Sequence, residues 1–225
     1  MKAVFLDRDG VINADREDYV TSWSQFHFLP GALEGLQHLT AAGYRLAVVT
    51  NQSAIGRGIA SAADVEEMNA RMVSALAEAG ARIDAVLCCP HAPEEGCACR
   101  KPSPGLLIEA ARRLRVSPAD TCVVGDWVDD IAAARAAGCA VPILVLTGRG
   151  RRALPLTRAA GLGPFLVARN LLAAAEAIVS WGGNGVATTK TPGREVEALG
   201  PPSRQPARPA GGPDRQVERA GRRAQ

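Results

Sequence analysis

Two carboxylates at the end of an apolar run are the first residues of this chain whose types and spacing could do chemistry. Residues 4–10 read Val-Phe-Leu-Asp-Arg-Asp-Gly, so Asp7 and Asp9 lie two positions apart, where Gly10 favours a turn. Carboxylates this close repel each other unless a positive group lies near them. Mg²⁺ meets that need in phosphate chemistry, because it prefers oxygen ligands and one or two carboxylates. A lone Asp-x-Asp is more often an acidic turn, so the interpretation depends on the rest of the chain.

Two further apolar runs end in polar residues in the same way. Residues 45–50 end in Thr50 and continue as Asn-Gln-Ser, and residues 121–126 end in Asp126. β-Branched runs that alternate with helical segments predict parallel strands joined by crossover helices. Ligands bind at the carboxyl ends of the strands in such folds. Because Asp7, Thr50 and Asp126 all fall at these ends, we expect them to form one site.

The alternation predicts one α/β domain over residues 1–181, built on a doubly wound parallel sheet. The expected strands are 3–7, 45–50, 84–88, 121–125, 142–146 and an edge strand at 165–167. The expected helices are 31–42, 62–79, 104–115, 129–137 and 170–180. Residues 182–225 are rich in Gly, Pro and Arg, and this composition predicts a disordered tail.

Composition favours a soluble protein of the cytoplasm. The chain has 225 residues, of which 47% are hydrophobic and 22% charged, as is usual for a globular protein. A net charge of +3 is too small to indicate nucleic acid or an acidic membrane as partner. We expect no signal peptide and no membrane span, because the chain shows neither pattern. We expect the protein to be a monomer.

Four segments carry a resemblance to a known family. LDRDG (residues 6–10), TNQS (50–53), CRKPSPG (99–105) and GDWVDD (125–130) resemble the four motifs of the haloacid dehalogenase-like (HAD) phosphohydrolases. They are most similar to the D-glycero-D-manno-heptose 1,7-bisphosphate phosphatase branch, whose sister is histidinol phosphatase. The resemblance covers roughly residues 1–180 and implies a Rossmann-like HAD fold. It also implies a Mg²⁺-dependent phosphatase that acts through an aspartyl-phosphate on a small phosphorylated substrate, such as a sugar bisphosphate.

The resemblance implies a role for each catalytic residue. Asp7 would be the nucleophile, and Asp9 would protonate the leaving oxygen and then activate water. Mg²⁺ would be held by the carboxylates of Asp7 and Asp126 and by the backbone carbonyl of Asp9, with Asp130 supporting that site. Thr50 and Lys101 would bind phosphoryl oxygens.

Substrate contacts are expected from loops, because the chain has no room for the large cap domain of other HAD enzymes. Residues 11–30 form only a short flap, so the site should be open. The expected contacts are Asn51, Gln52, Ser53 and Arg100, with Asp15, Asp18, Tyr19 and Val20 from the flap. Trp127 stands where the heptose branch carries a Lys, which changes the local charge.

A second metal site is predicted from cysteine spacing. Cys89-Pro-His91 is followed five residues later by Cys97-Ala-Cys99. Three thiolates and one imidazole suit a closed tetrahedral structural zinc site, and the heptose and histidinol branches share this pattern. The alternative is a chance cluster in a loop. Since Cys99 directly precedes Arg100, zinc would stabilise the loop that carries the basic motif.

Three other functions stay open at this point. The first is histidinol-phosphate phosphatase on the same scaffold. The second is a catalytically silent binding module, against which the intact acidic pair and Lys101 argue. The third is a nucleic-acid 3′-phosphatase, suggested by related motifs and by the arginines of the tail, although the core has no large basic cluster.

Overall fold

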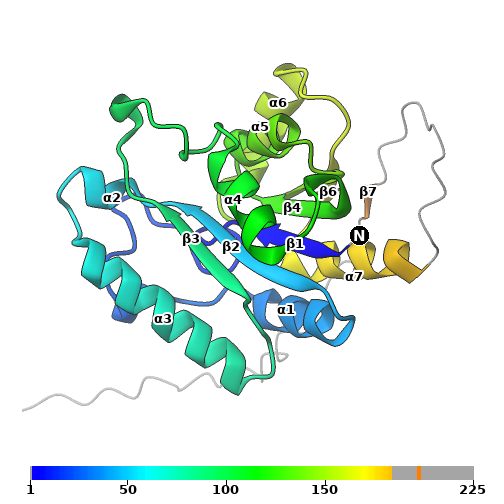
Figure 1. Cartoon of the computed structure of the whole chain (residues 1–225), viewed down its shortest axis with the longest axis horizontal. Helices are drawn as coiled ribbons and strands as arrows, with labels where there is room; N and C mark the ends of the chain where they lie inside the picture. Colours follow the sequence, from blue (N-terminus) through cyan, green and yellow to red (C-terminus); the bar gives the residue numbers. More distant parts are fainter. Residues whose placement is uncertain (1, 184–196, 199–225) are drawn as a thin grey trace, which may run out of the picture.

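The fold is a parallel sheet with helices on both faces (Figure 1). The computed structural model describes residues 2–183 and 197–198. The strands are β1 (Ala3–Leu6), β2 (Arg45–Asn51), β3 (Ala85–Cys89), β4 (Thr121–Gly125), β5 (Val141–Val145), β6 (Leu166–Ala168) and β7 (Glu197–Ala198). Their order is β3-β2-β1-β4-β5-β6-β7, with every neighbouring pair parallel. The doubly wound sheet expected from the sequence is confirmed.

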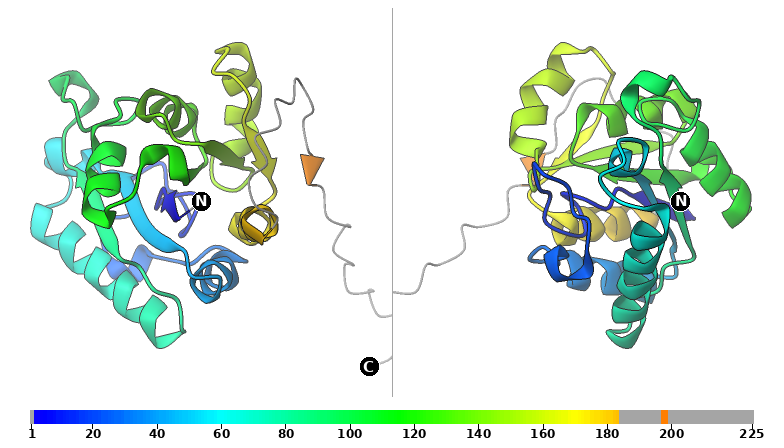
Figure 2. Two further views of the ribbon diagram at one scale, coloured as in Figure 1. Left: turned by 45° about the vertical axis from the view of Figure 1, so that its right-hand side comes forward. Right: turned by 90° about the vertical axis from the view of Figure 1, so that its left-hand side faces the viewer.

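Within the described residues, seven α-helices accompany the strands. They are α1 (Ala32–Ala41), α2 (Ser53–Gly56), α3 (Ala62–Glu78), α4 (Gly105–Leu114), α5 (Val128–Ala137), α6 (Gly150–Ala159) and α7 (Leu171–Gly183), with 3₁₀ turns at Trp23–Gln25, Pro93–Glu95 and Pro118–Asp120. Helices α1, α3 and α7 cover one face of the sheet, and α4, α5 and α6 cover the other (Figure 1). Figure 2 shows α1 and α7 side by side beneath the sheet.

Side-chain alternation divides the core between the two faces. On β1, Val4 and Leu6 pack in the cluster with α1, α3 and α7, while Ala3 and Phe5 pack in the cluster with α4 and α5. All four residues of this strand are fully buried. A strand that is buried on both faces has an apolar run rather than alternating polarity, which is why the strands were visible in the sequence.

Helices α2 and α6 and strand β7 were not predicted from the sequence. Helix α6 contains Pro155, which removes a helix hydrogen bond, so its sequence argues against a helix. Burial of Ala153 and Thr157, four residues apart, stabilises it against the sheet. Strand β7 pairs with β6, so β6 is not the edge strand that was expected. Apart from the end of α7 and this strand, the tail predicted over residues 182–225 lies outside the described residues.

Candidate active site

The site begins where the strand order reverses, between β1 and β4. Along the sheet the strands run in the order β3, β2, β1 and then β4, β5, β6, so the direction of chain progression changes between β1 and β4. Such a switch point opens a crevice at the carboxyl ends of the strands. Asp7 directly follows β1, and Asp126 directly follows β4. The Asp7 N–H donates to the carbonyl of Val124 at 2.9 Å, which continues the pairing of the two strands. The two acids that were predicted from separate motifs therefore face one crevice.

Three carboxylates at this point could hold a cation. Asp7, Asp126 and Asp130 each offer an oxygen, and these oxygens lie within 4.8 Å of one another. One oxygen of the buried Asp126 accepts the Arg149 N–H at 2.7 Å, whereas its Oδ1 has no partner among the described residues. A buried oxygen without a partner is costly unless a ligand completes it. The donor set therefore suits Mg²⁺, which takes carboxylate oxygens.

Two glycines from other loops, Gly10 and Gly148, pack against the carboxylate of Asp126. Gly10 and Gly148 have φ of +82° and +52°, and a Cβ at either position would collide with the Asp126 carboxylate. The Thr147 hydroxyl donates to the Gly10 carbonyl at 2.7 Å and holds the two loops together. The tight loop after β5 thus packs onto the loop after β1, and Asp126 is enclosed between them.

Burial shifts the protonation of these acids. It raises the pKa of Asp7 to about 6, against the opposing charge of Lys101 and with the help of Asp130. It raises the pKa of Asp126 to about 8, and the nearby carboxylates Asp7 and Asp130 add to the shift. Bound Mg²⁺ would favour the ionised form of both groups.

Without Mg²⁺, the free energy of unfolding is expected to fall as pH rises through a window of about 4 to 8. The pKa values of Asp7 and Asp126 lie above the ordinary value of 3.8, so the folded state holds more protons than the unfolded chain in this window. That advantage is lost as the two groups ionise. Because Mg²⁺ binds the ionised carboxylates, its stabilising effect should grow over the same window. Thermal melting across this range, with and without Mg²⁺, measures both trends.

Asp126→Asn is the control for this prediction, because it removes the group with the higher pKa. The Mg²⁺-free dependence of the melting temperature on pH should become flatter in this variant, above all between about pH 6 and 8. Equal dependence in wild type and variant would contradict the assignment.

Lys101 is buried between two of the acids. Its Nζ lies 3.0 Å from Asp7 and 2.6 Å from Asp130, and it donates to the carbonyl of Val49 at 2.8 Å. Burial opposes its charged form, but Asp130 and Asp7 outweigh that effect and raise the pKa of Lys101. The Asn51 side chain accepts the Lys101 N–H at 3.1 Å and donates to its carbonyl at 3.0 Å. Asn51, expected as a substrate contact, thus fixes the backbone of the lysine.

Asp9 is held from three directions, chiefly by a residue that sequence reasoning missed. Arg8 is fully buried and donates to both Asp9 oxygens, at 3.0 and 3.1 Å. Asn13 donates to one Asp9 oxygen at 2.8 Å, and Gln52 donates to the other at 2.7 Å. Gln52 also donates to the hydroxyl of Thr50 at 2.8 Å. Gln52, expected to bind substrate, thus positions two residues of the site.

Arg8 joins Asp9 to the rest of the fold. It donates to Asn69 of α3 at 3.0 Å, and its guanidinium lies 6.0 Å from the ring centre of Phe26 on the flap. The sequence held one sign of this role: Arg8 is a charged residue within an otherwise buried segment. A buried charge must be paired, so a partner such as Asp9 could have been expected.

A cleft of about 670 Å³ lies at the end of the sheet, and its lining includes Asp7, Asp9, Thr50, Lys101 and Asp130. Of the expected substrate contacts, the lining includes Asn51, Gln52, Ser53, Arg100, Asp15, Tyr19 and Val20. Asp18 is the exception, since it lies outside the lining, and it forms an exposed ion pair with Arg16 at 2.7 Å. A flap loop without periodicity gives no signal of which side chains face inward.

Several basic residues of the cleft were not predicted. They are Arg16, Arg57, Arg149 and Arg152. Arg149 belongs to the loop that follows β5, so the strand-end rule that identified the acids could also have identified it. Arg100, which was predicted, donates to the His91 carbonyl at 3.2 Å and so connects the cleft to the cysteine loop.

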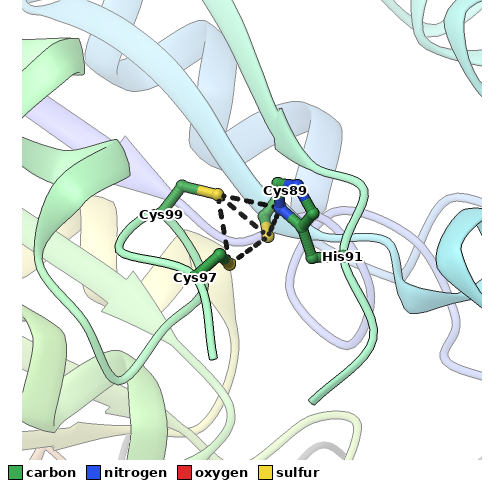
Figure 3. A group of neighbouring side chains, drawn as sticks. All are labelled: Cys89, His91, Cys97 and Cys99. Atoms are coloured by element: carbon green, nitrogen blue, oxygen red, sulfur yellow. Dashed lines mark hydrogen bonds between the residues drawn. The ribbon is translucent and has the colours of Figure 1, made fainter. Parts of the chain in front are cut away.

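The four residues of the cysteine loop point toward one another (Figure 3). The three sulfurs of Cys89, Cys97 and Cys99 lie 3.2 to 3.6 Å apart, and His91 Nδ1 lies 3.3 and 3.5 Å from two of them. Tetrahedral zinc with Zn–S bonds of about 2.3 Å would separate its sulfurs by roughly 3.8 Å, so the cluster is close to that geometry. Cys88 packs on the opposite face of β3, as alternation predicts.

Cys97→Ser is expected to lower zinc content from about one ion per chain and to lower the melting temperature, because the loop has little apolar core of its own. Elemental analysis and thermal melting of the purified variant measure both effects. Cys88→Ser is the matched control, since this neighbouring thiol lies outside the cluster. Retention of zinc by Cys97→Ser, or its loss from Cys88→Ser, would contradict the assignment of ligands.

A family model, similar proteins of known name and a solved structure all relate this chain to the HAD-like hydrolases. A family model described as HAD-hydrolase-like matches residues 98–174. The chain is 45% identical over 154 residues to the D-glycero-β-D-manno-heptose-1,7-bisphosphate 7-phosphatase of Bordetella bronchiseptica, covering 68% of this chain and 86% of that protein. It is 43% identical to the protein of that name from Pseudomonas putida, covering 68% of this chain and 87% of the relative.

The fold also matches a solved structure. The crystal structure of D,D-heptose 1,7-bisphosphate phosphatase from B. bronchiseptica, complexed with magnesium and phosphate, superimposes with a TM-score of 0.74 at 42% identity. The match covers 80% of this chain and 99% of that chain. Among the described residues, no helix has the length and apolar character that crossing a membrane requires.

Proposed function

This chain belongs to the HAD-like family of hydrolases and is a phosphatase, and we propose that it removes the 7-phosphate of D-glycero-β-D-manno-heptose 1,7-bisphosphate. The observation that carries the proposal is the buried cluster of Asp7, Lys101, Asp126 and Asp130 at the switch point of the sheet. The names of the relatives support the choice of substrate.

In the first step, an Asp7 carboxylate oxygen attacks phosphorus and the bond from phosphorus to the sugar oxygen breaks. Asp9 donates a proton to the leaving sugar oxygen, which becomes the 7-hydroxyl. The Arg8, Asn13 and Gln52 contacts fix the Asp9 carboxyl for this transfer. The product of the step is a phosphoryl group bonded to Asp7.

In the second step, Asp9 takes a proton from a water molecule, which attacks the phosphoryl group on the side opposite Asp7. The bond to Asp7 breaks, inorganic phosphate leaves, and both aspartates return to their starting states. The ammonium of Lys101, which lies 3.0 Å from Asp7, and the hydroxyl of Thr50, which lines the cleft, would bind phosphoryl oxygens. Mg²⁺ held by Asp7, Asp126 and the Asp9 carbonyl would offset the repulsion between nucleophile and phosphate.

The cleft suits a sugar that carries two phosphates. Its lining includes Arg57, Arg100 and Arg149, and Lys101 lies beside the nucleophile. One phosphate at Asp7 would leave the second near the arginines. A guanidinium can bind phosphate through two parallel hydrogen bonds, so arginine suits this task.

The test is phosphate release with Mg²⁺ from heptose 1,7-bisphosphate and from histidinol phosphate, measured side by side as kcat/KM. We expect a strong preference for the bisphosphate. Preference for histidinol phosphate would contradict the proposed substrate and leave the phosphatase chemistry intact. Activity on neither substrate would contradict the proposed function as a whole.

A further inference from the structure

Arg149 lies against an aromatic ring at the wall of the cleft. Its guanidinium is 4.9 Å from the ring centre of Trp127, within the range of a cation–π interaction. Both residues line the cleft. The Trp127 N–H donates to Asp130 at 3.0 Å, and the Arg149 N–H donates to Asp126 at 2.7 Å. The backbones of both residues are therefore fixed to acids of the reaction centre, and the stacked pair has a defined place beside it.

Arg149 has one carboxylate partner among the described residues, and that partner is on the flap. Its Nε lies 3.1 Å from Asp15, with the Arg149 side chain 47% exposed and the Asp15 side chain 26% exposed. An ion pair that is partly open to solvent contributes little net stability, so an anion of higher charge can displace the carboxylate. The partner of Arg149 is therefore exchangeable.

The other cations of the cleft lack this combination of a stacked ring and a partly exposed carboxylate partner. Lys101 is buried between Asp7 and Asp130, where it can serve only the phosphate that is attacked. Arg57 pairs with Glu94, and Arg100 donates to the backbone of the zinc loop. Arg16 pairs with Asp18 on the flap, and Arg152 lines the cleft from α6. Of these cations, Arg149 is the one stacked on an aromatic ring of the cleft.

We infer that Arg149, stacked on Trp127, binds the phosphate that remains on the substrate and exchanges Asp15 for it. This inference rests on the proposed function, since it needs a substrate with two phosphates. The ring holds the guanidinium plane in place, so that two parallel N–H groups can meet two phosphoryl oxygens. Release of Asp15 would free the flap from this wall when substrate binds.

The test compares two substrates that differ only in the second phosphate, heptose 1,7-bisphosphate and heptose 7-phosphate. The measured quantity is the ratio of their kcat/KM values with Mg²⁺. Arg149→Gln should lower this ratio by about 10- to 100-fold, as expected for the loss of a charge-assisted contact, and mainly through the KM of the bisphosphate. Arg149→Lys should lower it less, because the charge stays and the planar fork is lost. Trp127→Leu should also lower it, because the ring that orients the guanidinium is removed.

Arg151→Gln is the matched control. It removes the same charge two residues further along, in the first turn of α6, at an exposed residue that does not line the cleft, and should leave the ratio near the wild-type value. Thermal melting shows that each variant is folded. Binding of heptose 1-phosphate to Arg149→Gln, measured by calorimetry, gives a second readout without turnover and should weaken by a similar factor.

The two failures can be told apart. If wild type hydrolyses the bisphosphate but Arg149→Gln keeps the wild-type ratio, the inference is overturned and the proposed function stands. An equal fall of the ratio in Arg149→Gln and Arg151→Gln would also overturn it, because a general charge effect would then explain the data. If wild type hydrolyses neither heptose phosphate, the proposed function fails and the inference fails with it.

Discussion

Asp7→Asn should reduce kcat by on the order of 10⁴-fold or more, because an amide cannot act as the nucleophile that forms the phosphoryl intermediate. The change keeps the size of the side chain, and the Arg8 N–H can still donate to its oxygen as it does to Asp7 at 2.7 Å. The fold and zinc content should therefore be unchanged. Initial rates of phosphate release with saturating Mg²⁺, together with circular dichroism and elemental analysis, measure the three quantities.

Asp129→Asn is the comparison for Asp7→Asn. Asp129 lies at the start of α5 and faces the same cleft, yet it is not part of the three-carboxylate cluster. Its substitution removes an equal charge and should cost far less activity. Turnover of Asp7→Asn near the wild-type value, or an equal loss in both variants, would refute Asp7 as nucleophile.

Lys101→Met should destabilise the protein by about 3–5 kcal/mol at pH 8, the usual cost of removing one partner from a buried ion pair. The Lys101 side chain is only 3% exposed, and the variant would leave Asp7 and Asp130 facing each other without a positive charge between them. The loss should be smaller near pH 5, where protonation of a carboxyl relieves the repulsion. Activity should fall by roughly 10²- to 10³-fold, since a cation at the phosphoryl oxygens is lost. Urea unfolding at both pH values measures the first effect.

Two further variants isolate the cause. Lys2→Met removes a lysine whose pair with Asp120 is exposed, at 3.6 Å, and should change the free energy of unfolding by less than about 0.5 kcal/mol. Asp130→Asn combined with Lys101→Met should recover part of the lost stability, because one of the two unpaired charges is gone. A loss of stability in Lys101→Met that is independent of pH, with no recovery in the double variant, would show that packing rather than charge is responsible.

The site could be located from sequence because one geometric rule connects distant residues. In a parallel sheet the residues after each strand meet at one edge, and this brought Asp7, Thr50 and Asp126 together before any contact was known. The strands themselves were visible as apolar runs, because burial on both faces leaves no polar alternation. The cysteine loop was visible because zinc needs a fixed set of donors at short spacing.

What could not be predicted depends on side-chain direction. Arg8 lies between the two motif acids, but only the packing of the flap and α3 shows that it pairs with Asp9. Gln52, predicted as a substrate contact, lines the cleft, but its hydrogen bond to Asp9 could not be read from its motif. Asp18 and Asp15 lie on the same flap, but the Asp18 side chain is exposed to solvent. The sequence could not distinguish them, because a loop has no period that shows which side chains point inward. Such choices are made by tertiary packing, and local sequence carries little of that information.

The most direct test of the central claim is phosphorus NMR of heptose 1,7-bisphosphate during incubation with the enzyme and Mg²⁺. The account predicts that the signal of the 7-phosphate disappears, that inorganic phosphate appears in equal amount, and that the signal of the 1-phosphate persists. The same sample with Asp7→Asn should remain unchanged. Loss of the 1-phosphate signal, or persistence of both signals with wild type, would contradict the assignment of this phosphatase to the 7-position.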